Sequence, residues 1–126
     1  MKSYEELYED GRFILDERYT EILRLDNMLT EANIPHEKHR FLDGWQVVYF
    51  AGGKRIADAV QHFGSYGNEK NLIEIMGLVD PEEMMDSVLG NLTAENVFNR
   101  ISKHYKERRC VICRDIKNFG ITLGDL

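Results

Sequence analysis

The segment from His36 to Met76 constrains the fold most, because short apolar stretches alternate there with glycine-containing turn signals. The pair Asp43-Gly44 is typical of the two-residue type I′ turn, in which both central residues adopt positive φ. Phe41-Leu42 precedes this pair, and a run of mostly apolar residues follows it from 45 to 50. The pattern predicts a β-hairpin whose turn is Asp43-Gly44.

The predicted strand over residues 45–50 is apolar on both of its faces, at odd and at even positions. We therefore expect both faces to be covered, one by helices and the other by the C-terminal tail or a partner. Gly52-Gly53 predicts a turn into a strand over residues 55–62, and residues 72–76 predict another strand. The apolar spacing of these two segments also fits short helical faces, so both assignments stay open.

A helical pattern precedes the predicted sheet. Ser3 and Glu6 form a capping box, and apolar residues then recur mostly at steps of three and four as far as Ala32. This spacing predicts an N-terminal helical region with a break near Gly11. The segment 33–35 ends the region, because the residue before a proline disfavours helical geometry.

Two further helix signals follow the predicted strands. Residues 80–83, with an aspartate and then a proline, predict a short helix of one or two turns. Thr93 predicts the N-cap of a long C-terminal helix, whose apolar seam runs to Phe119 and whose stop is Gly120. The expected fold class is α+β: an N-terminal helix, a three- to four-stranded antiparallel meander and a long C-terminal helix packed on the sheet.

The length and composition fit one ordinary globular domain spanning residues 1–126. With 126 residues, of which 43% are hydrophobic, the chain can bury one core. No apolar run approaches the roughly 18 residues that cross a bilayer, and the acidic N-terminus has no secretory pattern. The pair Cys110 and Cys113 is not the disulfide framework of a secreted domain. We therefore expect a cytoplasmic protein without membrane association.

Charge is segregated along the chain, whose net charge is -6. Residues 1–33 hold nine acids and four bases, whereas residues 100–126 hold seven bases and three acids. The basic stripe is either a solvated helix face or a surface that holds an anion or the acidic helix of a neighbouring subunit in a homo-oligomer. The acidic total argues against duplex DNA as a partner. The stripe consists of Arg100, Lys103, Lys106, Arg108 and Arg109.

Metal-ligating residue types occur at unsuitable spacings. His36 and His39 are three residues apart, and side chains at that separation on a strand point to opposite faces. Cys110 and Cys113 lie within the apolar seam of the predicted helix, where structural thiols are the better interpretation. The sequence predicts neither a metal site nor a resident cofactor.

Residues 64–70 superficially suggest a phosphate-binding loop. They lack the required lysine spacing and connect two predicted strands, which favours a hairpin connection with positive-φ glycines. His62, Ser65 and Tyr66 remain candidate ligand contacts, because strand-end loops carry contacts more often than strand interiors. A serine nucleophile would also need an orienting acid and an oxyanion hole, so catalysis by His62 and Ser65 is disfavoured.

Five stretches carry a resemblance to known proteins: residues 34–36, 43–46, 61–67, 72–78 and 92–98. In these the chain resembles a group of small, largely uncharacterised proteins encoded by phages and prophages of Gram-positive bacteria. The resemblance covers about residues 18–106 and brings no known chemistry. Because small acidic phage proteins often antagonise bacterial defence, it implies an accessory protein of that kind by analogy.

Three functional hypotheses follow. The first is a non-enzymatic inhibitor that masks a host defence protein with the acidic residues 5–26, of which Glu17 and Glu21 would contact the partner. The second is a protein that sequesters a small (cyclic) nucleotide signal, and the third is a small enzyme using His62. The absence of a complete catalytic motif favours binding, and the masking inhibitor ranks first. In the second hypothesis phosphate would be held by Arg55, Arg108 or Arg109, with Trp45 or Tyr66 stacking on the base.

Overall fold

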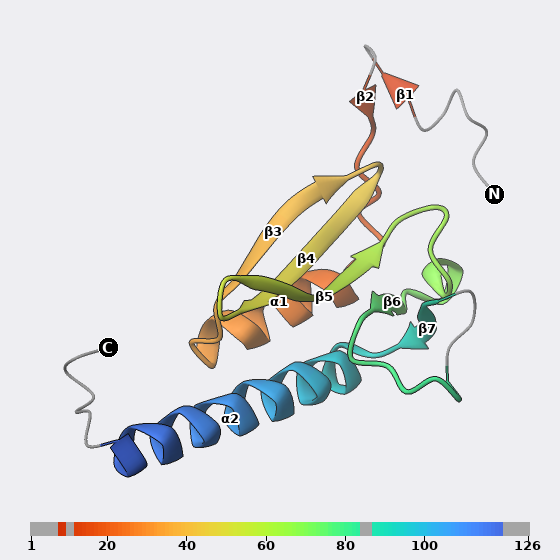
Figure 1. Ribbon diagram of the computed structural model, residues 1–126. Helices are drawn as coiled ribbons and strands as arrows, with labels where there is room; N and C mark the ends of the chain where they lie inside the picture. The colour runs from red at the N-terminus through yellow and green to blue at the C-terminus, as the bar shows by residue number, and fades with distance from the viewer. Residues whose placement is uncertain (1–7, 10–11, 84–86, 120–126) are drawn as a thin grey trace.

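The computed structural model describes residues 8–9, 12–83 and 87–119, with side chains described for 12–83 and 87–108. A five-stranded sheet and two helices form its main body, and a small two-stranded hairpin stands beside the sheet (Figure 1). No helix among the described residues combines the length and apolar character needed to cross a membrane. The elements in chain order are β1 (Tyr8–Glu9), β2 (Arg12–Phe13), α1 (Glu21–Glu31), β3 (His36–Phe41), β4 (Gly44–Ala51), β5 (Lys54–Gln61), the 3₁₀ helix η2 (Asn68–Lys70), β6 (Ile73–Met76), β7 (Leu89–Leu92) and α2 (Ala94–Phe119).

The α+β class is confirmed, but the sheet has five strands rather than three or four. Strands β3 to β7 pair in sequence order, each antiparallel to the next. The segments with two open interpretations, around residues 55–62 and 72–76, are strands β5 and β6. Within this sheet, the strand that the sequence did not predict is β7, a four-residue segment containing glycine and asparagine, which strands usually avoid.

The hydrophobic core lies between one face of the sheet and the two helices. Helix α1 lies across β3, β4 and β5, and α2 packs against α1 and β6. The C-terminal half of α2 continues past the sheet (Figure 1). On the opposite face Val48 and Val60 are also buried. The buried core residues of the two helices are Ile22, Leu25, Leu29, Ala94, Val97 and Ile101, and those of the three central strands are Val47, Tyr49, Ala51, Ala57, Ala59, Ile73 and Ile75.

The N-terminal helix is shorter than the sequence pattern predicts. Residues 12–13 are a strand, residues 17–18 form a turn, and α1 begins only at Glu21. Local contacts hold the chain out of helical geometry, because the Asp16 carboxylate accepts bonds from the backbone and guanidinium of Arg18. The predicted capping box at Ser3 and Glu6 lies outside the described residues.

The β3–β4 hairpin is confirmed, although the predicted turn residues were wrong. Gly44 pairs with Phe41 within the ladder, so the two turn residues are Leu42 and Asp43. The positive φ, 55°, belongs to Leu42. Gly44 is needed for a different reason: a Cβ there would overlap the carbonyl oxygen of Gln61 on β5.

The other turn and cap predictions have mixed outcomes. Gly52 and Gly53 form the β4–β5 turn, with φ of 60° and 73°. Thr93 caps α2, because its hydroxyl oxygen accepts a bond from the backbone N–H of Asn96 at 3.2 Å. The segment from Asp80 begins with a turn over residues 81–83, and any continuation into a helix falls on residues 84–86, outside the described part.

Candidate ligand-binding site

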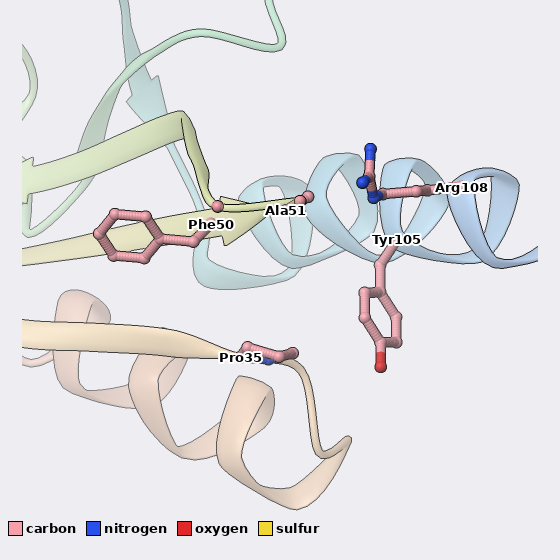
Figure 2. A pocket seen from close by; sticks show the side chains of 7 residues that line it. Pro35, Phe50, Ala51, Tyr105 and Arg108 are labelled. Atoms are coloured by element: carbon pink, nitrogen blue, oxygen red, sulfur yellow. The ribbon is translucent and has the colours of Figure 1, made fainter. Parts of the chain in front are cut away.

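A hollow of about 360 Å³ lies where the β4–β5 turn approaches α2. Three parts of the chain contribute to it: the residue before β3, the end of β4 with its turn, and the middle of α2 (Figure 2). Most of its walls are apolar, and a single guanidinium reaches the turn from the helix. The lining residues are Pro35, Phe50, Ala51, Gly52, Gly53, Tyr105 and Arg108.

The β4–β5 turn is shaped to accommodate Arg108. A Cβ on Gly52 would overlap Nη2 of Arg108, so the guanidinium occupies the space that any other residue would fill. Gly53 has no atom within 4 Å of a Cβ position and serves the turn through its positive φ alone. The ladder also shifts register between Tyr49 and Phe50, a type of irregularity that changes the direction of side chains near sites.

Arg108 is the cationic group of this hollow. Its side chain is exposed, and no carboxylate within the described side chains forms an ion pair with it. Behind the hollow, the buried Tyr49 hydroxyl donates a hydrogen bond to Nδ1 of His104 at 2.8 Å when that nitrogen is unprotonated. Burial raises the pKa of Tyr49, while the positive charge of Arg108 acts in the opposite direction.

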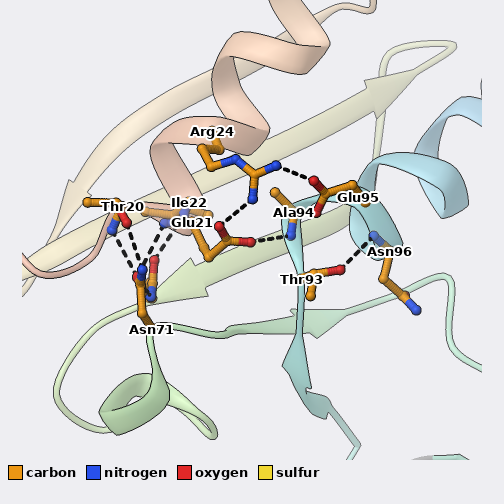
Figure 3. Close-up of polar contacts among 10 residues, drawn as sticks. Thr20, Glu21, Ile22, Arg24, Asn71, Thr93, Ala94, Glu95 and Asn96 are labelled. Carbon is orange, nitrogen blue, oxygen red and sulfur yellow. Dashed lines mark hydrogen bonds and ion pairs between the residues drawn. The ribbon is translucent and has the colours of Figure 1, made fainter.

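Contacts between the starts of the two helices fix where α2, and therefore Arg108, lies. The Glu21 carboxylate accepts a bond from the backbone N–H of Ala94 at 2.8 Å, at the first turn of α2 (Figure 3). The same carboxylate pairs with Arg24 at 2.5 Å, and Arg24 also pairs with Glu95. These contacts hold the N-terminus of α2 against α1, and packing of α2 on α1 and β6 sets the direction in which its later turns run.

Asn71 holds the start of α1 in a similar way. Its side-chain oxygen accepts bonds from the backbone N–H groups of Thr20 and Glu21 at 3.0 and 3.3 Å (Figure 3). The same oxygen accepts a bond from Gln61 at 2.7 Å. These bonds satisfy N–H groups that a helix start otherwise leaves unpaired. They connect α1 to the segment between β5 and β6, a contact that no local sequence pattern indicates.

The residues predicted at the end of β5 lie elsewhere, and their polar groups serve the loop itself. Ser65 is buried, and its hydroxyl accepts a bond from His62 N–H and donates one to the His62 carbonyl. Nδ1 of His62 accepts a bond from Gly64 N–H, so the two side chains do not form a nucleophile and base pair. Burial lowers the pKa of His62, and the Asp43 carboxylate opposes that shift. Tyr66 is 40% exposed on the same loop.

The other predicted contact residues are dispersed as well. Trp45 is half-buried beneath two cations, with Lys38 Nζ 5.0 Å and the Arg40 guanidinium carbon 5.5 Å from its ring centroid. Arg55 pairs with Asp58 at 3.1 Å.

The two acids predicted to contact a partner also lie apart from the hollow. Glu17 is exposed in the turn before α1, whereas the Glu21 carboxylate is bonded to the start of α2. The Arg109 side chain lies outside the described part. Of the predicted ligand contacts, the structure brings Arg108 to the hollow.

The sequence did not identify Pro35, Phe50 and Tyr105 as site residues. Each had a structural explanation: Pro35 as a helix stop, Phe50 as a strand residue and Tyr105 as part of the α2 seam. One signal of a site was present in the sequence, where Gly52-Gly53 directly follows an apolar strand end. A turn of this kind lets another backbone or side chain approach closely. Nothing in the sequence indicated that the approaching side chain comes from α2.

A second hollow, of about 390 Å³, has His104 in its lining and is more polar than the first. Arg100 crosses it, donating to both carboxylate oxygens of Glu83 at 3.0 and 2.9 Å and to the carbonyl of Leu78. This residue of the basic stripe therefore holds the segment before β7 against α2. Within the described side chains, no group of three or more histidine, cysteine, aspartate or glutamate residues is placed to hold a metal.

Comparisons of the chain with models of protein families, with curated proteins and with solved structures gave no match in any of the three.

Proposed function

We propose that the protein is a non-enzymatic binding protein that sequesters a small anionic ligand with a flat ring, in chemical class a cyclic nucleotide. The observation that carries this proposal is the Arg108 guanidinium, set against the Gly52 backbone at the edge of an apolar hollow. A guanidinium is suited to phosphate, because its planar donors can form two parallel hydrogen bonds with phosphate oxygens.

The size and walls of the hollow support such a ligand. Its volume of about 360 Å³ falls within the range of small-molecule sites, about 300 to 1,000 Å³. Phe50 and Tyr105 supply aromatic rings, and stacking of a base on such a ring contributes about 1 to 3 kcal/mol. The described lining residues include no carboxylate, thiol or imidazole that could act on the ligand, which supports binding without turnover.

The masking inhibitor that the sequence ranked first has less geometric support. It requires an acidic helix over residues 5–26, but the described chain is helical there only from Glu21. Glu21 is also engaged with Arg24 and the start of α2, which leaves its carboxylate little freedom to meet a partner. The resemblance to phage proteins makes a nucleotide signal of a bacterial defence system the ligand to test first.

The test is calorimetric titration with 3′,5′-cyclic AMP, with its uridine counterpart, and with adenosine and inorganic phosphate as the two fragments. We expect at least one cyclic nucleotide to bind more tightly than either fragment, and its affinity to fall as salt increases. Arg108→Gln should weaken binding about tenfold or more, as expected for loss of a hydrogen bond to a charged group. Lys106→Gln removes an exposed cation from the same helix, outside the hollow, and should bind normally.

Three results would contradict the proposal. The first is that neither cyclic nucleotide binds better than its fragments. The second is that Arg108→Gln and Lys106→Gln weaken binding equally, which would indicate a nonspecific attraction to the helix. The third is chemical conversion: the nucleotide recovered after incubation should be intact by chromatography, and a product that disappears with His62→Ala would make the protein an enzyme.

A further inference from the structure

Apolar side chains are exposed together at the end of the sheet far from the hollow. Ile14, Phe41 and Leu42 are 38%, 37% and 36% exposed. Backbone contacts bring their segments together, because Asp16 N–H donates to the Asp43 carbonyl at 2.7 Å. The Arg40 guanidinium donates to the carbonyls of Phe13 at 3.2 Å and Leu42 at 3.5 Å. We call this surface, formed by Ile14, Phe41 and Leu42, the apolar tip.

Leu42 is unusual at its position. Its φ of 55° is left-handed, a conformation that favours glycine and asparagine and is unfavourable for a bulky side chain. The side chain is also outside the core. Neither the backbone nor core packing explains a leucine there, and backbone conformations of this cost concentrate at sites of function.

Aromatic rings support the apolar tip from behind. The Phe41 ring lies 5.1 Å from the His62 ring, and Phe63 lies 6.0 Å from His62, measured between centroids. Phe63 in turn lies 5.4 Å from Phe13, which precedes Ile14 in the chain. These four rings join β2, β3 and the end of β5 at distances typical of favourable aromatic pairs. The tip is therefore held on a packed base, which lowers the entropy cost of binding through it.

Three arginines lie in the segments that form the apolar tip, in contrast to the net charge of the chain. Arg12 and Arg40 are exposed, and the Arg18 side chain is 69% exposed although it pairs with Asp16. Arg12 forms no ion pair with the described side chains. Glu17, exposed in the same segment, and Glu9, the partner of Arg12 in the β1–β2 ladder, offset part of this charge. Three guanidinium groups around exposed apolar residues complement a surface on which carboxylates surround apolar groups.

We propose that the apolar tip docks an acidic protein partner, whose apolar side chains cover Leu42, Phe41 and Ile14 while its carboxylates meet Arg12 and Arg18. A protein fits better than a nucleic acid, because two of the three exposed groups are aliphatic and offer no ring on which a base can stack. The tip and the hollow lie at opposite ends of β4, about 25 Å apart for eight residues at the usual strand rise. This proposal is therefore independent of ligand binding in the hollow.

The test uses two labelled amphipathic peptides that each carry leucines along one face, flanked by glutamates in one peptide and by lysines in the other. Fluorescence anisotropy should show that the full chain binds the glutamate peptide more tightly and that added salt weakens this binding. Leu42→Asn should weaken it about tenfold, because leucine supplies the apolar contact. Since asparagine tolerates the left-handed conformation, the unfolding midpoint of this variant should be equal or higher.

Two further variants locate the binding. Arg12→Glu should weaken binding of the glutamate peptide, and Arg108→Gln, at the opposite end of β4, should leave it unchanged. Equal binding of both peptides, no binding of the glutamate peptide, or full binding by folded Leu42→Asn would overturn the proposal. Tighter binding of a single-stranded oligonucleotide than of either peptide, lost in Arg12→Glu, would reassign the surface to nucleic acid. None of these peptide-binding outcomes depends on nucleotide binding in the hollow, so they test the apolar tip even where that binding fails.

Discussion

At the scale of single residues, the β3–β4 turn shows what a local pattern can and cannot predict. Asp43-Gly44 correctly predicted a hairpin, because the dipeptide is common near tight turns. The exact turn depends on distant groups: the buried Asp43 carboxylate accepts bonds from the Tyr19 hydroxyl and from Phe63 N–H. These partners lie 24 and 20 residues away in sequence, so no reading of the dipeptide alone could place the turn at Leu42-Asp43.

A substitution at Gly44 tests whether glycine is needed there because the Gln61 carbonyl of β5 lies so close. Gly44→Ala should destabilise the protein by about 1 to 3 kcal/mol, because the added Cβ would overlap the Gln61 carbonyl and force β4 away from β5. Gly53→Ala is the matched control, since its Cβ would meet open space and only its φ of 73° would be strained. Denaturant unfolding should show the larger loss for Gly44→Ala. A larger loss for Gly53→Ala would show that backbone conformation, and not the close approach of β5, is the main requirement for glycine at position 44.

The Glu83 and Arg100 pair predicts a pH dependence of stability. Hydrogen bonds from Arg100 and then from the Asp80 backbone lower the pKa of Glu83 from 4.5 to about 2. A carboxylate whose pKa is lower in the folded state stabilises that state above its unfolded pKa. This contribution should therefore be complete above about pH 4.5 and should be lost as the pH falls toward 2.

Unfolding free energies measured between pH 2 and 6 test this expectation. Glu83→Gln should make the acid side of the profile less steep than in the wild type. Its exposed neighbour provides the control, and Glu82→Gln should keep the wild-type slope. Profiles of equal slope for all three proteins would show that the ion pair adds nothing to folding.

At the scale of elements, long segments with a strong period were predictable and short or tethered ones were not. The α2 seam and the Thr93 cap predicted a helix that begins at Ala94, as observed. The N-terminal helix was predicted too long, because Tyr4 to Leu15 offered apolar residues at helical steps while Asp16 and Arg18 close a turn instead. Strand β7 was missed because four residues with a central glycine give too little periodicity.

Glu21 gives an element-scale test, because it joins the starts of α1 and α2. Glu21→Ala should cost about 1 to 2 kcal/mol of unfolding free energy, through loss of the bond to Ala94 N–H and of the pair with Arg24. Glu17→Ala, which changes an exposed turn residue, should stay within about 0.5 kcal/mol of the wild type. Equal effects of the two substitutions would contradict the structural role of Glu21.

At the scale of the whole molecule, the candidate site depends on tertiary structure that the sequence did not reveal. The sequence could predict Arg108 as an anion contact, because it belongs to a basic stripe in an otherwise acidic chain. Its aromatic neighbours could not be predicted, because Phe50 and Tyr105 are 55 residues apart in the chain and come to line one hollow only when α2 passes the end of β4. Trp45 and Tyr66 were better stacking candidates by composition, but neither lines the hollow.

The two proposed binding surfaces should act independently, and this is a prediction about the molecule as a whole. They lie at opposite ends of β4, and sites more than about 10 Å apart without shared partners usually contribute additively. A saturating cyclic nucleotide, at about 100 times its dissociation constant, should raise the unfolding free energy by about 2.7 kcal/mol in the wild type and equally in Leu42→Asn. Arg108→Gln, which should bind about tenfold more weakly or worse, should show a rise of about 1.4 kcal/mol or less at the same concentration. Affinity for the glutamate peptide should be the same with and without the nucleotide, because independent sites have no coupling free energy. A change of fivefold or more, about 1 kcal/mol, would show that β4 or α2 transmits ligand binding from one end of the sheet to the other.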